Sequence, residues 1–487
     1  MPAAWEPVIG LEVHVQLATR TKIFCRCPNR FGAAPNTLIC PICLGYPGTL
    51  PVLNREAVDL AVRLALALGC AVMPVSVFAR KNYFYADLPK GYQISQYDRP
   101  LARDGRLPLA EPGREVRIHR LHLEEDAGKL LHEAPGGVPL AGSSRVDFNR
   151  CGVPLVEIVS EPDLASAAEA EDYLRTLHQV LLYTATSDGN MEEGSLRCDA
   201  NVSLRRPGAA RLGIKTEIKN LNSFKNVARA LEVEIARQTE LLDAGVGVTH
   251  ETRGFDAERG ATFALRGKEE AHDYRYFPEP DLPPLGLDAE RLAALASGLP
   301  EMPWRRRARF VAQWGLAAAD ARDLTATPEL ADYFERAVAA APRAPRTVAN
   351  WVRNDVLREL RERGETIATA IAPARLGALL ELVESGELSA SAAKTVLGEV
   401  WASGEEPRAA TARLGLAQER DEDKLADWVA EVLAAHPQQV EQLRGGREQV
   451  LGFLVGQVMK RSAGRAAPQQ VQDMLRRAVA AGAATAP

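Results

Sequence analysis

Four of the seven cysteines lie within nineteen residues near the start of the chain, as the pairs Cys25-x-Cys27 and Cys40-x2-Cys43. Two such pairs can bring four thiolates to the corners of a tetrahedron, the usual geometry of a structural zinc site. The alternatives are four reduced, unliganded thiols or a disulfide pair. We predict structural zinc, because the other three cysteines are scattered along the chain. Such a site would not catalyse, since four protein ligands leave no coordination position open.

Carboxylates and histidines form a second group with chemical potential. Glu12 and His14 lie two residues apart in a segment of alternating apolar and polar side chains, Val8–Leu17, so both should point to one face of a strand. Further carboxylates occur in three segments: His122–Asp126, Val156–Val159 and Met191–Gly194. Such a set suits a hard divalent ion, and Mg²⁺ above all if phosphate is handled. The alternative is that each acid caps a helix or pairs with an arginine.

Three segments have compositions that could do chemistry: Arg80–Gln96, Lys215–Ser223 and Asp273–Asp281. The first mixes cations, aromatic rings and glycine, as nucleotide and single-stranded RNA sites do, and the second places cations and amides just before a helix N-terminus, where anions are favoured. The alternative for all three is a set of polar surface loops whose aromatic residues anchor them to the core. The chain contains no G-x-x-x-x-G-K-[ST], so an ATP site would not be a P-loop. It contains no G-x-S-x-G either, so we do not expect an amide-hydrolysing serine.

The elements that must position these residues can be predicted in part. Val8–Leu17 should be a half-buried strand, and the sequence predicts a helix from Asn54 to Gly69. A capping box, Ser166 with Glu169, starts a second helix, and a third follows Ser223. We therefore expect an α+β domain over residues 1 to about 290.

The composition changes after this region. From about residue 290 onward the chain is rich in Ala, Leu, Arg and Glu with helical periodicity, and a second break falls at Gly404–Pro407. The last fifty residues contain seven Lys or Arg and three Asp or Glu, although the whole chain has a net charge of −5. A basic helical tail would suit a large anionic partner; the alternative is an ordinary solvated helical face.

Length and composition limit the number of domains and the class of protein. The 487 residues are too many for one core, and 46% hydrophobic with 25% charged residues is ordinary for a globular protein. The sequence shows neither a signal peptide nor an apolar run long enough to span a membrane. We expect a cytoplasmic protein that does not contact a membrane.

Several long segments resemble the B subunit of the tRNA-dependent amidotransferases, and the similarity extends over essentially the whole chain. The segments that carry it are Val8–Leu17, Cys40–Gly48, Lys81–Gln96, Asp147–Asp163, Asp273–Pro284 and Leu451–Lys460.

The resemblance implies an α+β cradle-like catalytic domain, then an all-α helical domain and a small all-α tail domain that grips tRNA. We expect these domains at residues 1–290, 291–406 and 407–487. The implied enzyme is an ATP-dependent ligase that forms a carbon–nitrogen bond. It would phosphorylate the side-chain carboxylate of Glu-tRNA(Gln) or Asp-tRNA(Asn), and ammonia would then displace the phosphate.

The implied partners are the mischarged tRNA and two further subunits: an amidase (A), which frees ammonia from glutamine, and a small third one (C). The synthetase that mischarges the tRNA is a further candidate. The implied cofactors are ATP, Mg²⁺ and structural Zn²⁺, with the four clustered cysteines matching a zinc site that is not universal in the family.

The resemblance also assigns site residues. The implied magnesium ligands are Glu12, His14, Glu124, Glu125, Glu157 and Glu193, of which Glu12, His14 and Glu125 are expected to be catalytic. The residues expected around ATP or the aminoacylated 3′ end are Lys81, Tyr83, Lys90, Tyr92 and Gln93. The tail residues expected to contact tRNA are Lys460, Arg461 and Arg465.

Two other functions fit parts of the sequence. One is a zinc-containing RNA-binding or assembly subunit with no chemistry of its own. The other is a free-standing ATP-dependent ligase acting on a small carboxylic acid, but a small substrate would not need a remote basic tail.

Overall fold

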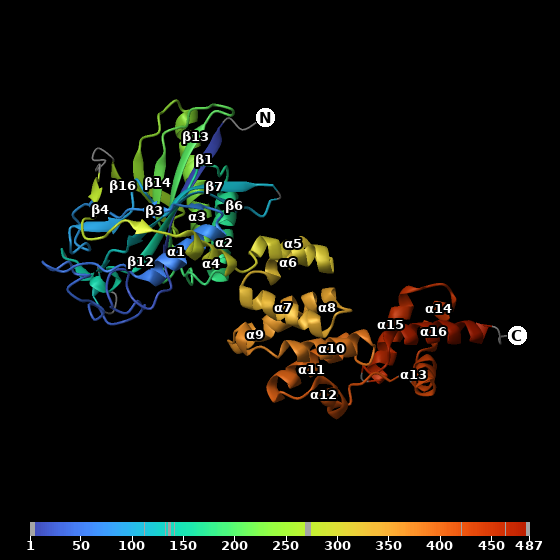
Figure 1. Cartoon of the computed structure of the whole chain (residues 1–487). Coiled ribbons are helices and arrows are strands. Elements are labelled where there is room, and N and C mark those ends of the chain that lie inside the picture. Colours follow the sequence, from blue (N-terminus) through green and yellow to red (C-terminus); the bar gives the residue numbers. More distant parts are fainter. Residues whose placement is uncertain are drawn as a thin grey trace. The chain divides into compact units, whose positions relative to one another are not determined.

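The computed structural model describes residues 5–111, 113–131, 133–134, 138–140, 142–267, 274–419, 421–462 and 464–483. Asp273, the first residue of the third polar and aromatic segment, lies outside these residues. The chain divides into two compact units, residues 1–304 and 305–487 (Figure 1). Among the described residues, no helix has the length and apolar character needed to cross a membrane.

The first unit is built on a nine-stranded sheet with the strand order β16-β15-β14-β13-β1-β12-β7-β6-β2. Neighbouring strands run antiparallel except for the parallel pair β14 and β15. The strands are β1 Glu6–Gln16, β2 Ala71–Val72, β6 Ala102–Pro108, β7 Glu115–Glu125, β12 Pro154–Ser160, β13 Leu196–Arg205, β14 Thr216–Leu221, β15 Glu251–Asp256 and β16 Ala261–Gly267.

The alternation in β1 divides the sheet into an apolar and a polar face. Ile9, Leu11, Val13 and Val15 are buried in the main hydrophobic core, together with side chains of three helices. Those helices are α1 Arg55–Ala67, α2 Ala167–Tyr183 and α3 Phe224–Asp243, and a shorter helix, α4 Ala289–Ser297, packs on α1. The even-numbered residues of β1 lie on the opposite face, because successive side chains of a strand alternate.

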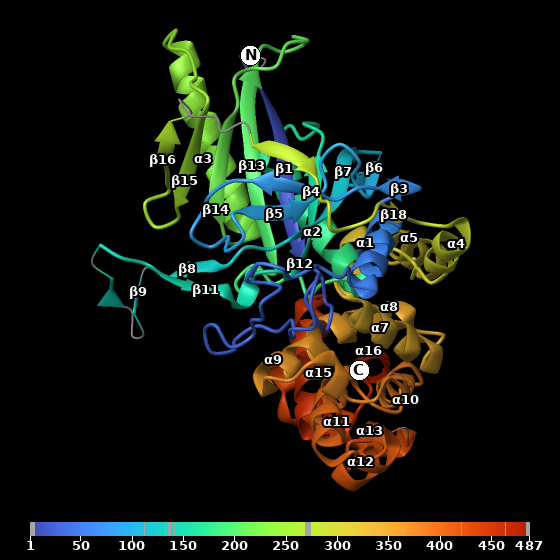
Figure 2. The same ribbon diagram turned by 60° about the vertical axis from the view of Figure 1, so that its left-hand side comes forward.

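A small sheet lies over this polar face. Figure 2 shows β4 and β5 on one side of the large sheet, with α2 and α3 on the other. The order is β17-β4-β5, with bounds Arg275–Pro278, Ala79–Asn82 and Tyr92–Ser95. The remaining short elements are β3 Val75–Ser76, β8 Lys129–Leu131, β9 Glu133–Ala134, β10 Val138–Pro139, β11 Arg145–Asp147, β18 Leu285–Gly286 and a 3₁₀ turn at Phe148–Arg150.

Among the described residues of the second unit, the regular elements are all helices, joined by short connections that include two isolated β-bridges. Its hydrophobic side chains form two separate clusters, one drawn from residues 310–410 and the other from residues 425–475. The helices are α5 Pro303–Trp314, α6 Ala318–Leu324, α7 Pro328–Ala340, α8 Pro345–Trp351, a π-helical turn Val352–Val356, α9 Leu357–Arg363, a 3₁₀ turn Ile367–Thr369, α10 Pro373–Glu384, α11 Ala390–Ser403, α12 Pro407–Leu414, α13 Glu422–Ala435, α14 Pro437–Arg444, α15 Gln449–Arg461 and α16 Pro468–Ala483.

The expected fold class, an α+β region followed by helices, is confirmed. The predicted helix starts are also found: Asn54, Ser166 and Ser223 each accept a hydrogen bond from a backbone N–H in the first turn. The division into three domains at residues 290 and 406 remains a prediction.

Candidate active site

Three neighbouring strands bring polar side chains into one row on the polar face. His14 in β1 lies opposite Glu157 in β12, and Glu157 lies opposite His122 in β7. Residues directly opposite each other in antiparallel strands have side chains on the same face, about 4.5–5.5 Å apart at Cβ. Glu124, two residues after His122, belongs to the same face. The strand register therefore gathers two histidines and two carboxylates from positions far apart in sequence.

The ligand atoms of His14, Glu124 and Glu157 lie within 4.8 Å of one another. Nε2 of His14 is 3.6 Å from Oε2 of Glu157 and 4.0 Å from Oε1 of Glu124. Nε2 of His122 is 3.4 Å from Oε2 of Glu157 and 3.5 Å from Oε2 of Glu124. Two carboxylates and an imidazole at this spacing fit a divalent cation.

The histidines and carboxylates of the cluster shift each other's pKa values. Burial alone would lower the pKa of His122, but the Glu157 and Glu124 carboxylates raise it to about 9. The same carboxylates outweigh burial at His14 and raise its pKa. In return, the two histidines hold the pKa of Glu157 well below its usual value despite burial. The carboxylates therefore stay ionised inside the protein, as a cation site requires.

Lys81 and Tyr276 of the small sheet face this cluster across a cavity of about 300 Å³. Lys81 in β4 lines it, with Nζ 4.8 Å from the ring centre of Tyr274 and 5.7 Å from that of Tyr83. Burial would lower the pKa of Lys81, but Glu124 and other groups raise it, so its ammonium is retained. Positive charge beside a carboxylate cluster is suited to binding phosphate.

Glu12 lines the same cavity but is engaged differently from His14. Its Oε1 accepts a hydrogen bond of 3.0 Å from Nδ2 of Asn201, and Asp199 lies opposite it in β13. Nζ of Lys219 is 2.8 Å from Asp199 and 3.1 Å from Glu217. All of these side chains except Asn201 line the cavity of the cluster.

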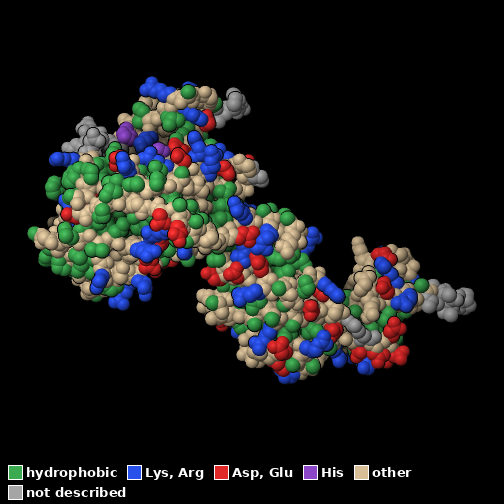
Figure 3. Space-filling model, in the orientation of Figure 1, with side chains coloured by type: hydrophobic (Ala, Val, Ile, Leu, Met, Phe, Trp, Pro, Cys, Tyr) green, Lys and Arg blue, Asp and Glu red, His purple; other side chains and the backbone are tan. Residues whose placement is uncertain are grey.

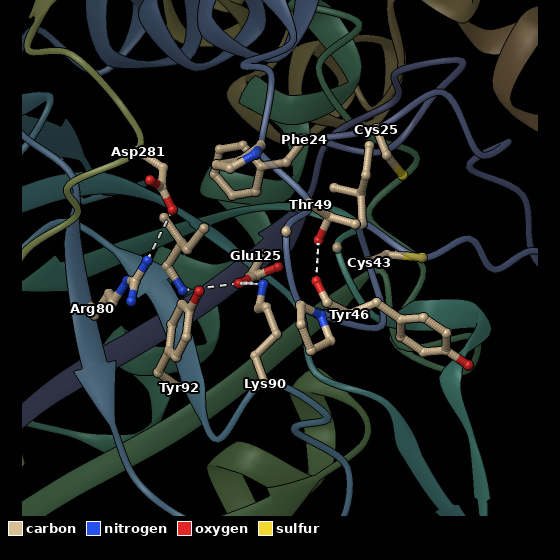
Figure 4. Close-up of a pocket in the computed structure, with 17 residues that line it drawn as sticks. Phe24, Cys25, Cys43, Tyr46, Thr49, Arg80, Lys90, Tyr92, Glu125 and Asp281 are labelled. Atoms are coloured by element: carbon tan, nitrogen blue, oxygen red, sulfur yellow. Dashed lines mark hydrogen bonds and ion pairs between the residues drawn. The ribbon is translucent and has the colours of Figure 1, made fainter.

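Glu125 lies in a second cavity, of about 240 Å³, apart from the His14 cluster. Its carboxylate forms an ion pair with Lys90 and accepts a hydrogen bond from the backbone N–H of Ile94. Figure 4 shows Lys90 and Glu125 pointing toward each other, with Tyr92 beside them. Gln93 donates a hydrogen bond of 2.7 Å to the backbone oxygen of Glu125. Of the five expected ATP or 3′-end residues, Lys81 and Tyr83 are thus near the first cavity and the others near the second.

The four clustered cysteines also come together. Cys25, Cys27, Cys40 and Cys43 place their Sγ atoms within 4.8 Å of one another, which makes them a candidate metal site. A hydrogen bond from Cys25 and the positive charge of Lys22 hold the pKa of the Cys43 thiol below its usual value despite burial, which favours a thiolate at this position. Cys25 and Cys43 also line the cavity that contains Glu125 (Figure 4).

Comparisons with known proteins decide the family. Residues 7–293 match the family model of the GatB/GatE catalytic domain, and residues 332–479 match that of the GatB domain. The chain belongs to the GatB family. Two proteins named as the B subunit of aspartyl/glutamyl-tRNA(Asn/Gln) amidotransferase, from Geobacter sulfurreducens and Carboxydothermus hydrogenoformans, are each 52% identical over 475 residues, which is 97% of this chain and 98% of theirs. The protein of that name from Myxococcus xanthus is 50% identical over 481 residues, 98% of this chain and 99% of its own.

Family membership confirms the resemblance found in the sequence, but the individual site residues remain predictions. Within this GatB-family chain, the structure groups His14, Glu124 and Glu157, with Glu12 in the same cavity. It does not bring Glu125 or Glu193 to that group. Glu193 is exposed and lines another cavity, beside Asp188.

His122, Asp199 and Lys219 belong to the site and were not assigned from the sequence. A signal for His122 did exist, because His122 and Glu124 have the same two-residue spacing as Glu12 and His14. Lys219 lies in the segment Lys215–Ser223, which the sequence had marked as a candidate site without singling this residue out. Asp199 gave no comparable signal, since only the pairing of β13 with β1 brings it to the cavity.

The three expected tail residues lie at the end of α15 and in the loop that follows. Arg461 is 2.6 Å from a carboxylate oxygen of Glu431, and the Arg465 guanidinium lies 5.6 Å from the ring centre of Trp428. Lys460 is exposed. On the face drawn in Figure 3, basic and acidic side chains are interspersed over the second unit. The tRNA contacts of this tail therefore remain a prediction.

Proposed function

We propose that this chain is the component of a tRNA-dependent amidotransferase that activates and amidates the aminoacyl group. The substrate would be Glu-tRNA(Gln), Asp-tRNA(Asn) or both, since the choice depends on which mischarged tRNA the cell supplies. The observation that carries this proposal is the cluster of half-buried His14 with buried Glu124 and Glu157, with Lys81 across the same cavity. The names of the family's curated members support it.

The chemistry needs two steps, because a carboxylate is a poor electrophile. The side-chain carboxylate first attacks the γ-phosphorus of ATP, which releases ADP and leaves an acyl phosphate. Ammonia then attacks the acyl carbon and expels inorganic phosphate, which leaves the amide. Phosphoryl transfer depends mainly on alignment and on neutralising phosphate charge, so no protein nucleophile is required.

The cluster side chains would hold Mg²⁺, with Glu12 close by. A bound Mg²⁺ would supply neutralising charge for the transferred phosphoryl group. Lys81 would contribute fixed positive charge at the cavity, and the Tyr83 and Tyr274 rings beside it would offer apolar surface for the bound substrate. Lys90 and Glu125 would act in the neighbouring cavity.

The remaining assignments concern structure and partners. Zinc bound by the four cysteines would stabilise the segment that carries Tyr46 and the wall of the second cavity. The expected partners are an amidase subunit that releases ammonia from glutamine and a small third subunit. The mischarging synthetase is a further candidate partner.

The decisive experiment measures phosphate release from γ-labelled ATP by the complex reconstituted with both partners, with glutamine and ammonia withheld. Uncharged tRNA, Glu-tRNA(Gln) and Asp-tRNA(Asn) would be compared. We expect release that is stimulated only by a mischarged tRNA, and the tRNA that stimulates it names the substrate. If the complex binds tRNA but neither mischarged tRNA stimulates phosphate release, the chain is an RNA-binding scaffold and the proposal is wrong.

A further inference from the structure

The cysteine site and the Lys90–Glu125 ion pair lie in the walls of one cavity. Cys25 and Cys43 line it on the side of the cysteine site, and the ion pair lines it as well (Figure 4). The side chains of Lys90 and Glu125 are only 9% and 4% exposed. When one partner of a buried ion pair is removed, the other charge is left without compensation. The position of Lys90 therefore decides the charge inside this cavity.

A tight turn follows the second cysteine pair. The backbone N–H of Leu44 donates to the carbonyl oxygen of Cys40, and that of Gly45 donates to the carbonyl oxygen of Ile42. Gly45 comes two residues after Cys43 and has a φ of +67°, a conformation that glycine adopts without strain. A zinc ion bound to Cys40 and Cys43 would fix both ends of this turn.

Lys90 packs directly on the backbone of the turn. An added Cβ at Gly45 would lie 2.1 Å from Cγ of Lys90 and 3.1 Å from its Cβ and Cδ, so this contact requires glycine. The aliphatic stem of Lys90 thus lies against Gly45, while its ammonium reaches Glu125. A shift of the turn would shift the stem as well, because close-packed interiors transmit such displacements.

A second glycine connects Glu125 with the cysteine site. An added Cβ at Gly152 would lie 3.5 Å from Cβ of Cys43 and 3.9 Å from Oε2 of Glu125. Gly152 therefore lies beside both residues. Each member of the ion pair is within reach of the cysteine site through the backbone of one glycine, Gly45 for Lys90 and Gly152 for Glu125.

We propose that zinc at the cysteine site positions Lys90, because it fixes the turn at Gly45 and so keeps the Lys90 ammonium on Glu125. The inference rests on the zinc assignment of the proposed function and goes beyond it, since zinc occupancy then sets the charge in the second cavity. Gly45 is the positioning residue, acting through the stem of Lys90. When zinc is lost, the turn loses the ligand that fixes it, and Lys90 separates from Glu125.

The first test labels the lysines of the full-length protein with a small amine-acylating reagent, with zinc bound and after chelation. Mass spectrometry measures the rate at Lys90, and Lys225, an exposed residue of α3, is the internal reference. We expect chelation to raise the Lys90 rate about tenfold or more relative to Lys225, because the reagent reaches an amine only after local opening. Thermal unfolding checks that the chelated protein is folded. A Lys90 rate that does not change with zinc loss would overturn the proposal.

Two glycines of the same segment separate the packing contact from backbone strain. Gly45 and Gly48 both have positive φ, +67° and +82°, so alanine is strained at either position. Only at Gly45 does the added Cβ meet Lys90, since nothing lies within 4 Å of one at Gly48. We expect zinc-loaded Gly45→Ala to be labelled faster at Lys90 than the wild type, and Gly48→Ala to match the wild type.

Zinc retention gives a second readout of the same contact. Gly45→Ala should lose zinc to a chelator faster than Gly48→Ala, and adding Lys90→Ala, which removes the clashing Cγ, should restore retention. Equal labelling and equal zinc loss in the two glycine variants would overturn the positioning role. A wild-type protein that binds no zinc would refute the zinc assignment together with this inference. The proposed amidation chemistry is tested separately, by phosphate release.

Discussion

Glu124 and Glu125 are adjacent residues whose carboxylates have different surroundings. Glu124 faces His14 and His122, and Ser95 donates a hydrogen bond of 3.1 Å to it. Glu125 forms an ion pair with Lys90 in the other cavity. The difference follows from strand geometry, because successive side chains point in opposite directions. The pair therefore offers a test of which carboxylate binds the cation.

We predict that Glu124→Gln raises the Mg²⁺ concentration needed for half-maximal phosphate release by about tenfold or more, because an anionic ligand is lost. Glu125→Gln is the matched variant and should leave this Mg²⁺ dependence unchanged, since its partner is Lys90. A Mg²⁺ titration of tRNA-stimulated phosphate release measures both. Equal shifts for the two variants would place Glu125 among the ligands.

Lys22 is a buried residue with an unusual partner. It is fully buried, and its Nζ donates a hydrogen bond of 3.7 Å to Sγ of Cys43. Four thiolates on one zinc ion carry excess negative charge, which a nearby ammonium offsets. We predict that Lys22→Met loses zinc to a chelator about tenfold more readily than the wild type. Arg20→Met, an exposed change two residues away, is the control, and equal zinc retention by both variants would refute the prediction.

At the level of single residues, sequence reasoning recovered what local spacing encodes. Glu12 and His14 share a strand face because they are two residues apart, and the cysteines are paired at metal-ligand spacing. The partners that complete the cluster come from β7 and β12, and their alignment depends on strand register. Register is set by the packing of the whole sheet, which is why Glu125 could not be separated from Glu124 beforehand.

Among the elements, helices were more predictable than strands, because helix starts are encoded locally whereas strand pairing depends on distant residues. The helices α1, α2 and α3 begin at caps that are visible within four residues of sequence. The nine-stranded order was not predicted, because β1 pairs with residues of β12 and β13 that are at least 139 positions away in sequence. Such pairings leave no local signature.

Helix α3 is fixed to the edge of the sheet by a buried carboxylate. Glu234 is 0% exposed, 2.6 Å from Arg237, and accepts hydrogen bonds from Gln238 in α3 and Thr262 in β16. Burial would raise the pKa of Glu234, but these bonds lower it below its usual value. Its contribution to stability is therefore complete above the pKa of an unfolded glutamate, about 4.3, and is lost as the pH falls through the folded value.

We predict that Glu234→Gln lowers the free energy of unfolding of the first unit by about 2–4 kcal/mol at pH 7, because the arginine loses its buried partner. The variant should also lose less stability than the wild type between about pH 5 and pH 3. Urea unfolding across this pH range measures both effects. Glu232→Gln, an exposed change on the same helix, is the control and should match the wild type. If Glu234→Gln loses as much unfolding free energy as the wild type between pH 5 and pH 3, the prediction is wrong.

For the whole molecule, the two units carry different kinds of chemistry. The first unit contains the His14 and Glu125 cavities and the cysteine cluster, whereas the regular elements described in the second unit are helices around two apolar cores. A net charge of −5 does not favour binding of nucleic acid over the whole surface, so any contact with tRNA must use local positive charge. Several tail arginines already have acidic partners, such as Arg461 with Glu431 and Arg476 with Glu448.

The tail prediction therefore concerns cations without an acidic partner. Lys460 is exposed, and Arg477 bonds only to the backbone oxygen of Asp473 among the described residues, so both side chains can turn to phosphates. We predict that Lys460→Gln combined with Arg477→Gln weakens tRNA binding and reduces the slope of log affinity against log salt by about 1 per lost phosphate contact. Titrations of tRNA into the reconstituted complex at several KCl concentrations measure the slope. Arg343→Gln removes an exposed cation outside the tail and controls for loss of charge alone. If the effect is general electrostatics, the salt slope of this variant should fall as much as that of the tail variant. If the tail residues contact phosphates directly, the salt slope of Arg343→Gln should equal that of the wild type.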